Sequence, residues 1–220
     1  MRLQRSLETK ADDVNLGPRL GLVDYGSGNL RSVTKALEAA GAQITRLEQG
    51  PIAAGFDAVV LPGVGAFGDS VKQLKNRDLF VPLQTWLNDD RRFLGVCLGF
   101  QLLFESSEES PGVAGLGIFQ GQVRKFPKGT VKVPQIGWNS VKWTEHARGL
   151  FADLPLDPYF YFVHSYYPQP QDESIVAGYT EYGHRFAAAV ATKNLLATQF
   201  HPEKSQESGL LLLRKFLDTL

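Results

Sequence analysis

The feature that most constrains this chain is a short apolar run interrupted by two glycines and a cysteine. Residues 93–101 read FLGVCLGFQ, which indicates a buried strand followed at once by a helix. Gly95 and Gly99 lie two positions before and after Cys97, and small residues there permit a tight strand-to-helix turn. Such a turn lifts the central side chain out at the carboxyl end of a sheet. At the start of a helix, Cys97 would also be favoured as a thiolate.

The rest of the first half repeats this alternation of short apolar strands with helices. We expect strands at 20–24, 42–47, 57–61 and 92–96, and helices at 29–40, 71–88 (in one or two pieces) and 98–105. Later segments alternate in polarity and are separated by turn residues, which predicts antiparallel strands at 121–126, 131–143, 159–167, 175–182, 184–192 and 195–200, before a last helix at 206–220. The sequence therefore predicts a three-layer α/β fold, with a central mostly parallel sheet flanked by helices and added antiparallel strands in the second half.

Composition narrows the class of protein. The 220 residues are 43% hydrophobic with a formal net charge of zero, so we expect one globular domain at 20–220 and no nucleic-acid partner. Residues 1–19 are polar without a period and are predicted to be a flexible extension. No apolar run is long enough to span a membrane, and no signal peptide precedes the first strand. A single cysteine fits a cytoplasmic location, and without CxxC, HExxH or a full dinucleotide fingerprint we expect neither metal nor cofactor.

A thiol nucleophile needs a base and a group that orients the base. Of the four histidines, His201 is the best candidate, because it follows an apolar strand and opens the sequence His-Pro-Glu. Side chains two apart in an extended chain share a face, so Glu203 can hold one imidazole nitrogen while the other faces Cys97.

At this point the motifs resemble a known family. The sequence GVCLGFQ, with the later HPEKS and the loop PGVGAF at 62–67, is similar to class I, triad-type glutamine amidotransferases. DYGSGNL at 24–30, GWN at 137–139 and FVHSY at 162–166 resemble more narrowly the glutaminase subunits of imidazole glycerol phosphate synthases. The resemblance runs from about residue 20 to the C-terminus.

The resemblance implies roles for particular residues. The catalytic triad would be Cys97, His201 and Glu203, and the oxyanion hole would use Gly63, Val64 and Leu98. Substrate-binding residues would be Gly65, Gln101, His164, Ser165 and Tyr166, and partner-interface residues Asn29, Trp138 and Asn139. Gly63 and Gly65 are expected to be turn glycines with positive φ, and a peptide between them is expected to change orientation when the partner binds.

The resemblance also implies a reaction and a partner. Glutamine would be hydrolysed to glutamate and ammonia. Because ammonia in neutral water is protonated, it needs a channel to an acceptor site. In the family that site belongs to a (β/α)₈-barrel cyclase, with which the glutaminase forms a heterodimer. The cyclase makes imidazole glycerol phosphate and aminoimidazole carboxamide ribotide in histidine biosynthesis.

Several alternatives stay open from the sequence. The chain could be the glutaminase of another amidotransferase, such as pyridoxal phosphate synthase, although GWN and HSY favour histidine biosynthesis. It could be a stand-alone γ-glutamyl hydrolase or cysteine protease of the same fold, or a degenerate relative that only binds a partner. The loop at 25–29 has only Gly-x-Gly, so we interpret it as a strand-to-helix turn with Ser27 or Gly28 as the helix cap rather than a phosphate site.

Overall fold

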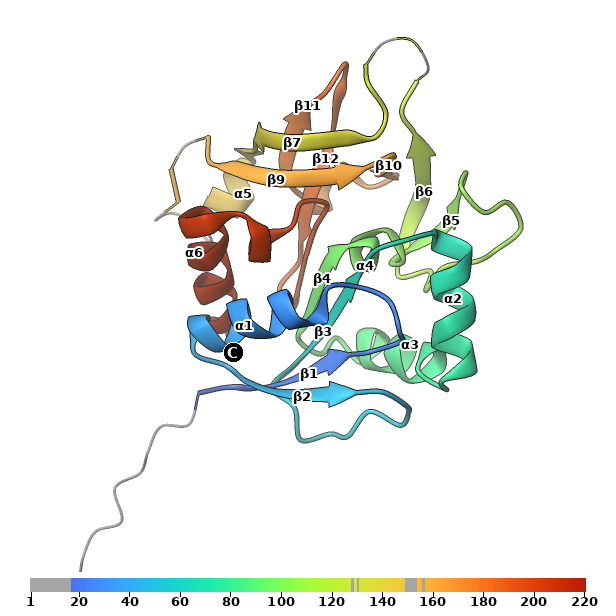
Figure 1. Ribbon diagram of the computed structural model, residues 1–220, viewed down its shortest axis with the longest axis vertical. Helices are drawn as coiled ribbons and strands as arrows, with labels where there is room; N and C mark the ends of the chain where they lie inside the picture. Colours follow the sequence, from blue (N-terminus) through green and yellow to red (C-terminus); the bar gives the residue numbers. More distant parts are fainter. Residues whose placement is uncertain (1–16, 128, 130, 149–153, 156) are drawn as a thin grey trace, which may run out of the picture.

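The computed structural model describes residues 17–220 except 128, 130, 149–153 and 156, and its main feature is a twisted sheet (Figure 1). The described residues form eight strands in this sheet, in the order β2-β1-β3-β4-β13-β12-β11-β8. Their bounds, in that order, are Gln43–Leu47, Arg19–Val23, Ala58–Gly63, Phe93–Cys97, Leu195–Thr198, Arg185–Ala191, Val176–Glu181 and Lys142–Trp143. The first five strands run parallel and the last three continue the sheet in antiparallel pairs.

Helices cover both faces of the sheet, as Figure 1 shows. Helices α1 (Leu30–Ala40) and α6 (Gln206–Leu217) contact each other on one face, and α2 (Phe67–Asn76) and α3 (Phe80–Asn88) contact each other on the other. Side chains along a strand alternate between the faces, so each parallel strand contributes to two separate cores. In β4, for example, Leu94 and Val96 belong to the first core and Phe93 to the second. The predicted three-layer α/β architecture is confirmed.

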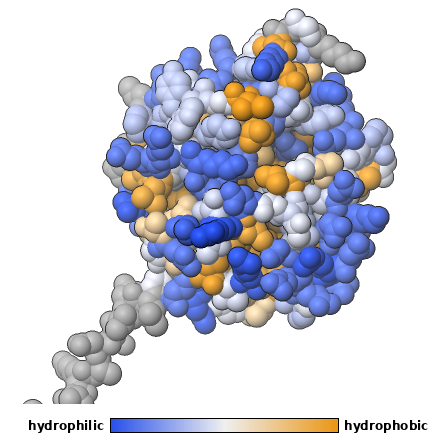
Figure 2. Space-filling model, in the orientation of Figure 1, coloured by the Kyte–Doolittle hydropathy of each residue, from blue (hydrophilic) through white to orange (hydrophobic). Residues whose placement is uncertain are grey.

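The second half adds two smaller sheets. Strand β6 (Phe119–Lys125) pairs with β5 (Phe104–Ser107) and β10 (Tyr166–Pro170), and β7 (Gln135–Ser140) pairs with β9 (Tyr159–His164). The short elements are α5 (Glu145–Arg148), η1 (Glu173–Ile175) and η2 (Pro202–Lys204). On the face in Figure 2, apolar residues appear as small patches among hydrophilic ones. None of the described helices is long and apolar enough to cross a membrane.

Some predicted boundaries are wrong. The helix expected at 98–105 is only α4 (Leu98–Gln101), and β5 begins three residues later. The residues after α4 pack into the core instead of continuing the helix. The carbonyl of Leu103 accepts hydrogen bonds from two backbone N–H groups of the segment that leads into β6. Residues 1–16 of the expected extension lie outside the described residues, and Arg19 already belongs to β1. The boundary at 19/20 stays a prediction.

The two glycines around Cys97 are required by close packing. Neither has a positive φ, but a Cβ on Gly99 would overlap the backbone carbonyl oxygen of Leu61 in β3. A Cβ on Gly95 would lie 3.1 Å from the Ala197 Cβ in β13. The first turn of α4 can therefore lie directly against the sheet only because both positions lack a side chain.

We predict that Gly99→Ala destabilises the protein by roughly 1–3 kcal/mol, since the added methyl group overlaps rigid backbone. The matched control is Gly55→Ala, whose Cβ would meet only the flexible end of Arg19 at 3.6 Å and should change stability little. Urea unfolding of both variants provides the comparison. Equal stability of Gly99→Ala and the control would contradict the packing argument.

Candidate active site

Cys97 is the last residue of β4 and stands in a strained backbone conformation. Its φ is 55° and its ψ is −104°, in a region that side-chain-bearing residues seldom adopt. This is the sharp turn that the glycine-cysteine-glycine pattern predicts. The thiol is 5% exposed, at the carboxyl end of the parallel strands. Because β3 pairs with β4 in register, Gly63 lies directly beside Cys97.

The strand on the other side of β4 delivers the candidate base. Strand β13 runs parallel to β4, with Thr198 opposite Val96, so the chain leaves the sheet next to the cysteine. His201 follows, and its backbone N–H donates to the Tyr161 carbonyl at 2.9 Å. The Ser205 hydroxyl donates to the His201 carbonyl at 2.6 Å and accepts from the Tyr161 N–H at 2.9 Å. These bonds fix the histidine backbone from both sides.

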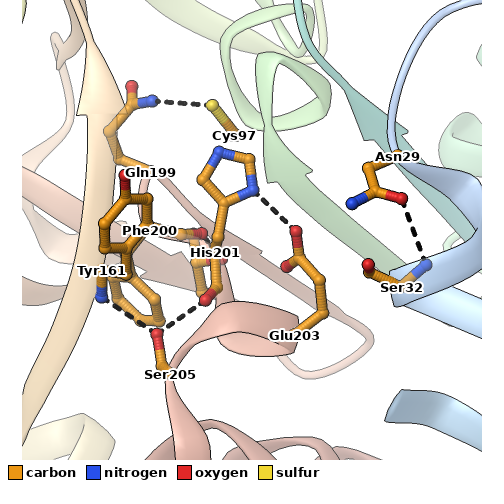
Figure 3. A network of polar contacts seen from close by, with 10 residues as sticks. Asn29, Ser32, Cys97, Tyr161, Gln199, Phe200, His201, Glu203 and Ser205 are labelled. Carbon is orange, nitrogen blue, oxygen red and sulfur yellow. Dashed lines mark hydrogen bonds and ion pairs between the residues drawn. The ribbon is translucent and has the colours of Figure 1, made fainter. Parts of the chain in front are cut away.

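The imidazole of His201 lies between Cys97 and Glu203 (Figure 3). Its Nδ1 is 2.8 Å from Glu203 Oε1, and both side chains are 3% exposed. Its Nε2 is buried and has no hydrogen-bond partner among the described residues. Burial lowers the pKa of His201, but the cysteine sulfur and the Glu203 carboxylate together raise it to about 10. At neutral pH the surroundings therefore favour the protonated, imidazolium form of His201.

The loop after β3 forms one wall of the site. Gly65 has a φ of 103°, as expected for a turn glycine, whereas Gly63 does not have a positive φ and that expectation is wrong. Gly63 is needed for another reason, because a Cβ there would overlap the buried hydroxyl of Tyr25. The hydroxyl of Ser27 donates to the carbonyl of Val64. The loop at 25–29 is thus joined to the loop at 62–65 by a hydrogen bond.

These elements enclose a pocket of about 420 Å³. The predicted site residues that line it are Val64, Gly65, Cys97, Leu98, Gln101, His164, Ser165 and Tyr166. Its lining also includes Pro134, Val163 and two charged residues that sequence reasoning missed, Glu109 and Lys204. The pocket therefore combines the thiol of Cys97 with one acidic and one basic side chain. The described residues contain no cluster of side chains that could hold a metal ion.

The histidine of the HSY motif has a clear structural environment. Burial lowers the pKa of His164 to about 4, so its ring is neutral. Because the Tyr166 carbonyl can only accept, the 2.8 Å contact requires that His164 Nδ1 carries the proton and donates it. The ring packs against Phe126 and Phe162.

The three predicted interface residues lie outside the pocket lining. Asn29 caps α1, with its side-chain oxygen 3.4 Å from the Ser32 N–H, so the helix cap is neither Ser27 nor Gly28. Trp138 is 46% exposed on β7, and the Asn139 side chain donates to the Glu181 carbonyl at 2.9 Å.

Gln199 is the polar neighbour of Cys97 that sequence reasoning missed. It is fully buried, and its Nε2 lies 3.6 Å from the Cys97 sulfur (Figure 3). A signal was present, because Gln199 precedes His201 by two residues and so shares its face of the extended chain.

Comparison with known proteins shows the family to which the chain belongs. The model of the class I glutamine amidotransferase family matches residues 21–220. The fold resembles a solved glutamine amidotransferase, with a TM-score of 0.71 at 19% identity over 91% of this chain and 97% of that one. It also resembles the structure of PurLQS from Thermotoga maritima, with a TM-score of 0.73 at 17% identity over 92% and 98% of the two chains.

Closer sequence relatives carry a more specific name. Two proteins called imidazole glycerol phosphate synthase subunit HisH, from Aquifex aeolicus and Methanothermobacter thermautotrophicus, are 46% and 45% identical to this chain. The alignment with the first protein covers 90% of this chain and 95% of that protein. The alignment with the second covers 91% of this chain and 98% of that protein. The chain therefore belongs to the class I glutamine amidotransferases and, within them, to the HisH subunits of imidazole glycerol phosphate synthase.

Proposed function

We propose that this chain hydrolyses the side-chain amide of glutamine through a triad of Cys97, His201 and Glu203. The observation that carries the proposal is the buried imidazole between the cysteine and the carboxylate, with its pKa raised to about 10. That arrangement supplies a thiolate nucleophile and a general acid in one pair of side chains.

In the first half of the reaction, the Cys97 thiolate attacks the amide carbon of glutamine and a C–S bond forms. The carbonyl oxygen becomes an oxyanion, which the N–H groups of Leu98 and of the Gly63–Val64 region stabilise by roughly 3–4 kcal/mol per donor. The His201 imidazolium gives its proton to the leaving nitrogen as the C–N bond breaks. Ammonia and a glutamyl thioester result.

In the second half, the now neutral His201 takes a proton from water, and the hydroxide attacks the thioester carbon. The C–S bond breaks, the thiolate and imidazolium are restored, and the new side-chain carboxylic acid gives its proton to water as glutamate leaves. Glu203 keeps its hydrogen bond to Nδ1 throughout and so presents Nε2 to the reacting atoms.

The pocket suits a free amino acid. Glu109 and Lys204 line it together with the nucleophile, so it offers one charge of each sign to the ammonium and carboxylate groups of glutamine. The acidic group is held in place, because Glu109 Oε2 accepts from the Phe67 N–H at 2.7 Å. The fit explains why we favour glutamine over a peptide substrate.

We further propose that the ammonia passes to a (β/α)₈-barrel cyclase in a cytoplasmic heterodimer. Relatives at 42–46% identity are named as synthase subunits, which supports this partner over that of pyridoxal phosphate synthase or a stand-alone hydrolase. Asn29, Trp138 and Asn139 are the proposed contact residues. Asn29 is the last residue of the loop at 25–29, in which the Ser27 hydroxyl binds the Val64 carbonyl. Docking of the partner at Asn29 can therefore reorient a peptide of the oxyanion loop.

Glutamate release from glutamine tests the proposed function directly. Wild type should be active mainly with the barrel subunit and its nucleotide ligand, and Cys97→Ala should lose essentially all of this activity, because no other cysteine can replace the nucleophile. Strong activity of the free wild-type chain would favour a partner-free hydrolase. Unchanged activity of Cys97→Ala would refute the mechanism.

The pH dependence tests the role of Glu203. The imidazolium of His201 is present below its raised pKa, so the alkaline limb of kcat/KM should fall as pH passes about 10. Glu203→Gln removes one of the interactions that raise this pKa, so the limb should move to lower pH and kcat should drop about 10²–10⁴-fold. An alkaline limb that stays in place would show that Glu203 does not act through His201.

Ser27→Ala tests the link between the interface and the oxyanion loop. Loss of its bond to the Val64 carbonyl should raise activity without the partner about five-fold, the effect of one ordinary hydrogen bond, and lower the stimulation by the partner. Ser27→Thr keeps the hydroxyl and should behave like wild type. Stimulation equal to wild type in Ser27→Ala would count against this link.

A further inference from the structure

A chain of hydrogen bonds from side chains outside the proposed triad reaches the Cys97 sulfur. The side-chain amide of Gln199 donates through Nε2 to the sulfur at 3.6 Å, an ordinary length for a bond to sulfur. Gln199 has no exposed surface, and it does not line the pocket. Neither the acid-base chemistry nor substrate binding, as proposed above, uses this residue.

The direction of this chain is fixed at its far end. The Tyr166 carbonyl can only accept, and it receives hydrogen bonds from His164 Nδ1 at 2.8 Å and Gln101 Nε2 at 3.0 Å. The Gln101 amide must therefore turn its NH₂ group toward Tyr166. The same NH₂ group donates to Gln199 Oε1 at 3.1 Å. Gln199 is left with its own NH₂ group facing the cysteine.

We propose that Gln199 is a positioning residue that stabilises the Cys97 thiolate and holds its sulfur in the attacking orientation, with Gln101 fixing the direction of the Gln199 amide. This deepens the proposed glutaminase function and rests on it. A hydrogen bond to a charged acceptor is stronger than one to a neutral acceptor, so the bond favours thiolate over thiol. Because the site is buried, no water molecule replaces this hydrogen bond when the Gln199 amide is removed.

The proposal also refines the role of Gln101. Both hydrogens of its Nε2 are engaged, one by Tyr166 and one by Gln199. Toward the pocket, which it lines, Gln101 can offer only its Oε1 as an acceptor. It would thus accept a hydrogen bond from a substrate N–H group while orienting Gln199 behind it.

Replacing Gln199 by another uncharged residue leaves every charged and titratable group around Cys97 in place. His201 and the buried Tyr25 interact electrostatically with Cys97, and Glu109 and Lys204 line the same pocket. Replacing Gln199 by methionine keeps the length of the side chain and removes only the amide. A change in thiol reactivity can therefore be assigned to the lost donor.

The test is the rate at which iodoacetamide alkylates the single cysteine, measured across pH on the full chain. Gln199→Met should move the pH profile of alkylation upward, so that alkylation on the rising, low-pH side of the profile slows about 10-fold, the loss expected for one hydrogen bond to a charged group. Thr198→Val is the matched control, because it removes one buried hydrogen bond, to the Phe200 carbonyl at 3.0 Å, from the residue next to Gln199. It should alkylate like wild type.

A second readout separates positioning from a structural effect. With the partner present, Gln199→Met should lower kcat for glutamine with little change in KM, since the residue does not line the pocket. If Gln199→Met does not fold, Gln199→Asn, which is one methylene too short to reach the sulfur, should give the same losses.

The outcomes distinguish the two proposals. Alkylation by folded Gln199→Met or Gln199→Asn at the rate of Thr198→Val would overturn the role of Gln199, whether or not the enzyme hydrolyses glutamine. Slower alkylation in these variants supports the role of Gln199. If the wild type then hydrolyses no glutamine even with its partner, the proposed function fails while the hydrogen bond to the sulfur stands.

Discussion

The attraction between the Cys97 sulfur and the His201 imidazole is the interaction on which the rest of the site depends. Burial alone would lower the pKa of His201, and the sulfur and Glu203 reverse that effect. The pair is stable only if both side chains are held in place, because a buried charge without its partner is costly. The surrounding structure therefore has to fix the cysteine, the histidine and the carboxylate at once.

The parallel sheet meets this requirement through neighbouring strands. Strand β4 ends in the strained Cys97, β13 on one side leads into His201, and β3 on the other leads into the loop that we propose forms the oxyanion hole. Next to His201 in the chain, Phe200 stacks on Phe160 with ring centroids 4.0 Å apart, which anchors the segment that carries His201. The site thus lies where the carboxyl ends of three adjacent strands meet, the usual place for a site in such a sheet.

The local features of the site could be predicted from the sequence, whereas the long-range ones could not. The turn at Cys97 and the pairing of His201 with Glu203 follow from neighbouring residues and from strand periodicity. The shortening of α4, the contact of Ser27 with Val64 and the approach of Gln199 to Cys97 join segments far apart in the chain. No local pattern specifies such contacts. The sequence suggests a positive φ at Gly63, but φ there is not positive, and close packing against Tyr25 is what selects glycine.

The most direct measurement is the protonation state of His201, followed by ¹⁵N NMR of the labelled ring in the free chain. We expect an imidazolium at neutral pH that loses its proton only as pH approaches about 10. In Cys97→Ala the sulfur no longer raises the pKa of His201, so the proton should leave at clearly lower pH. A neutral His201 ring at pH 7 in the wild type, or a titration unchanged in Cys97→Ala, would contradict the thiolate–imidazolium pair.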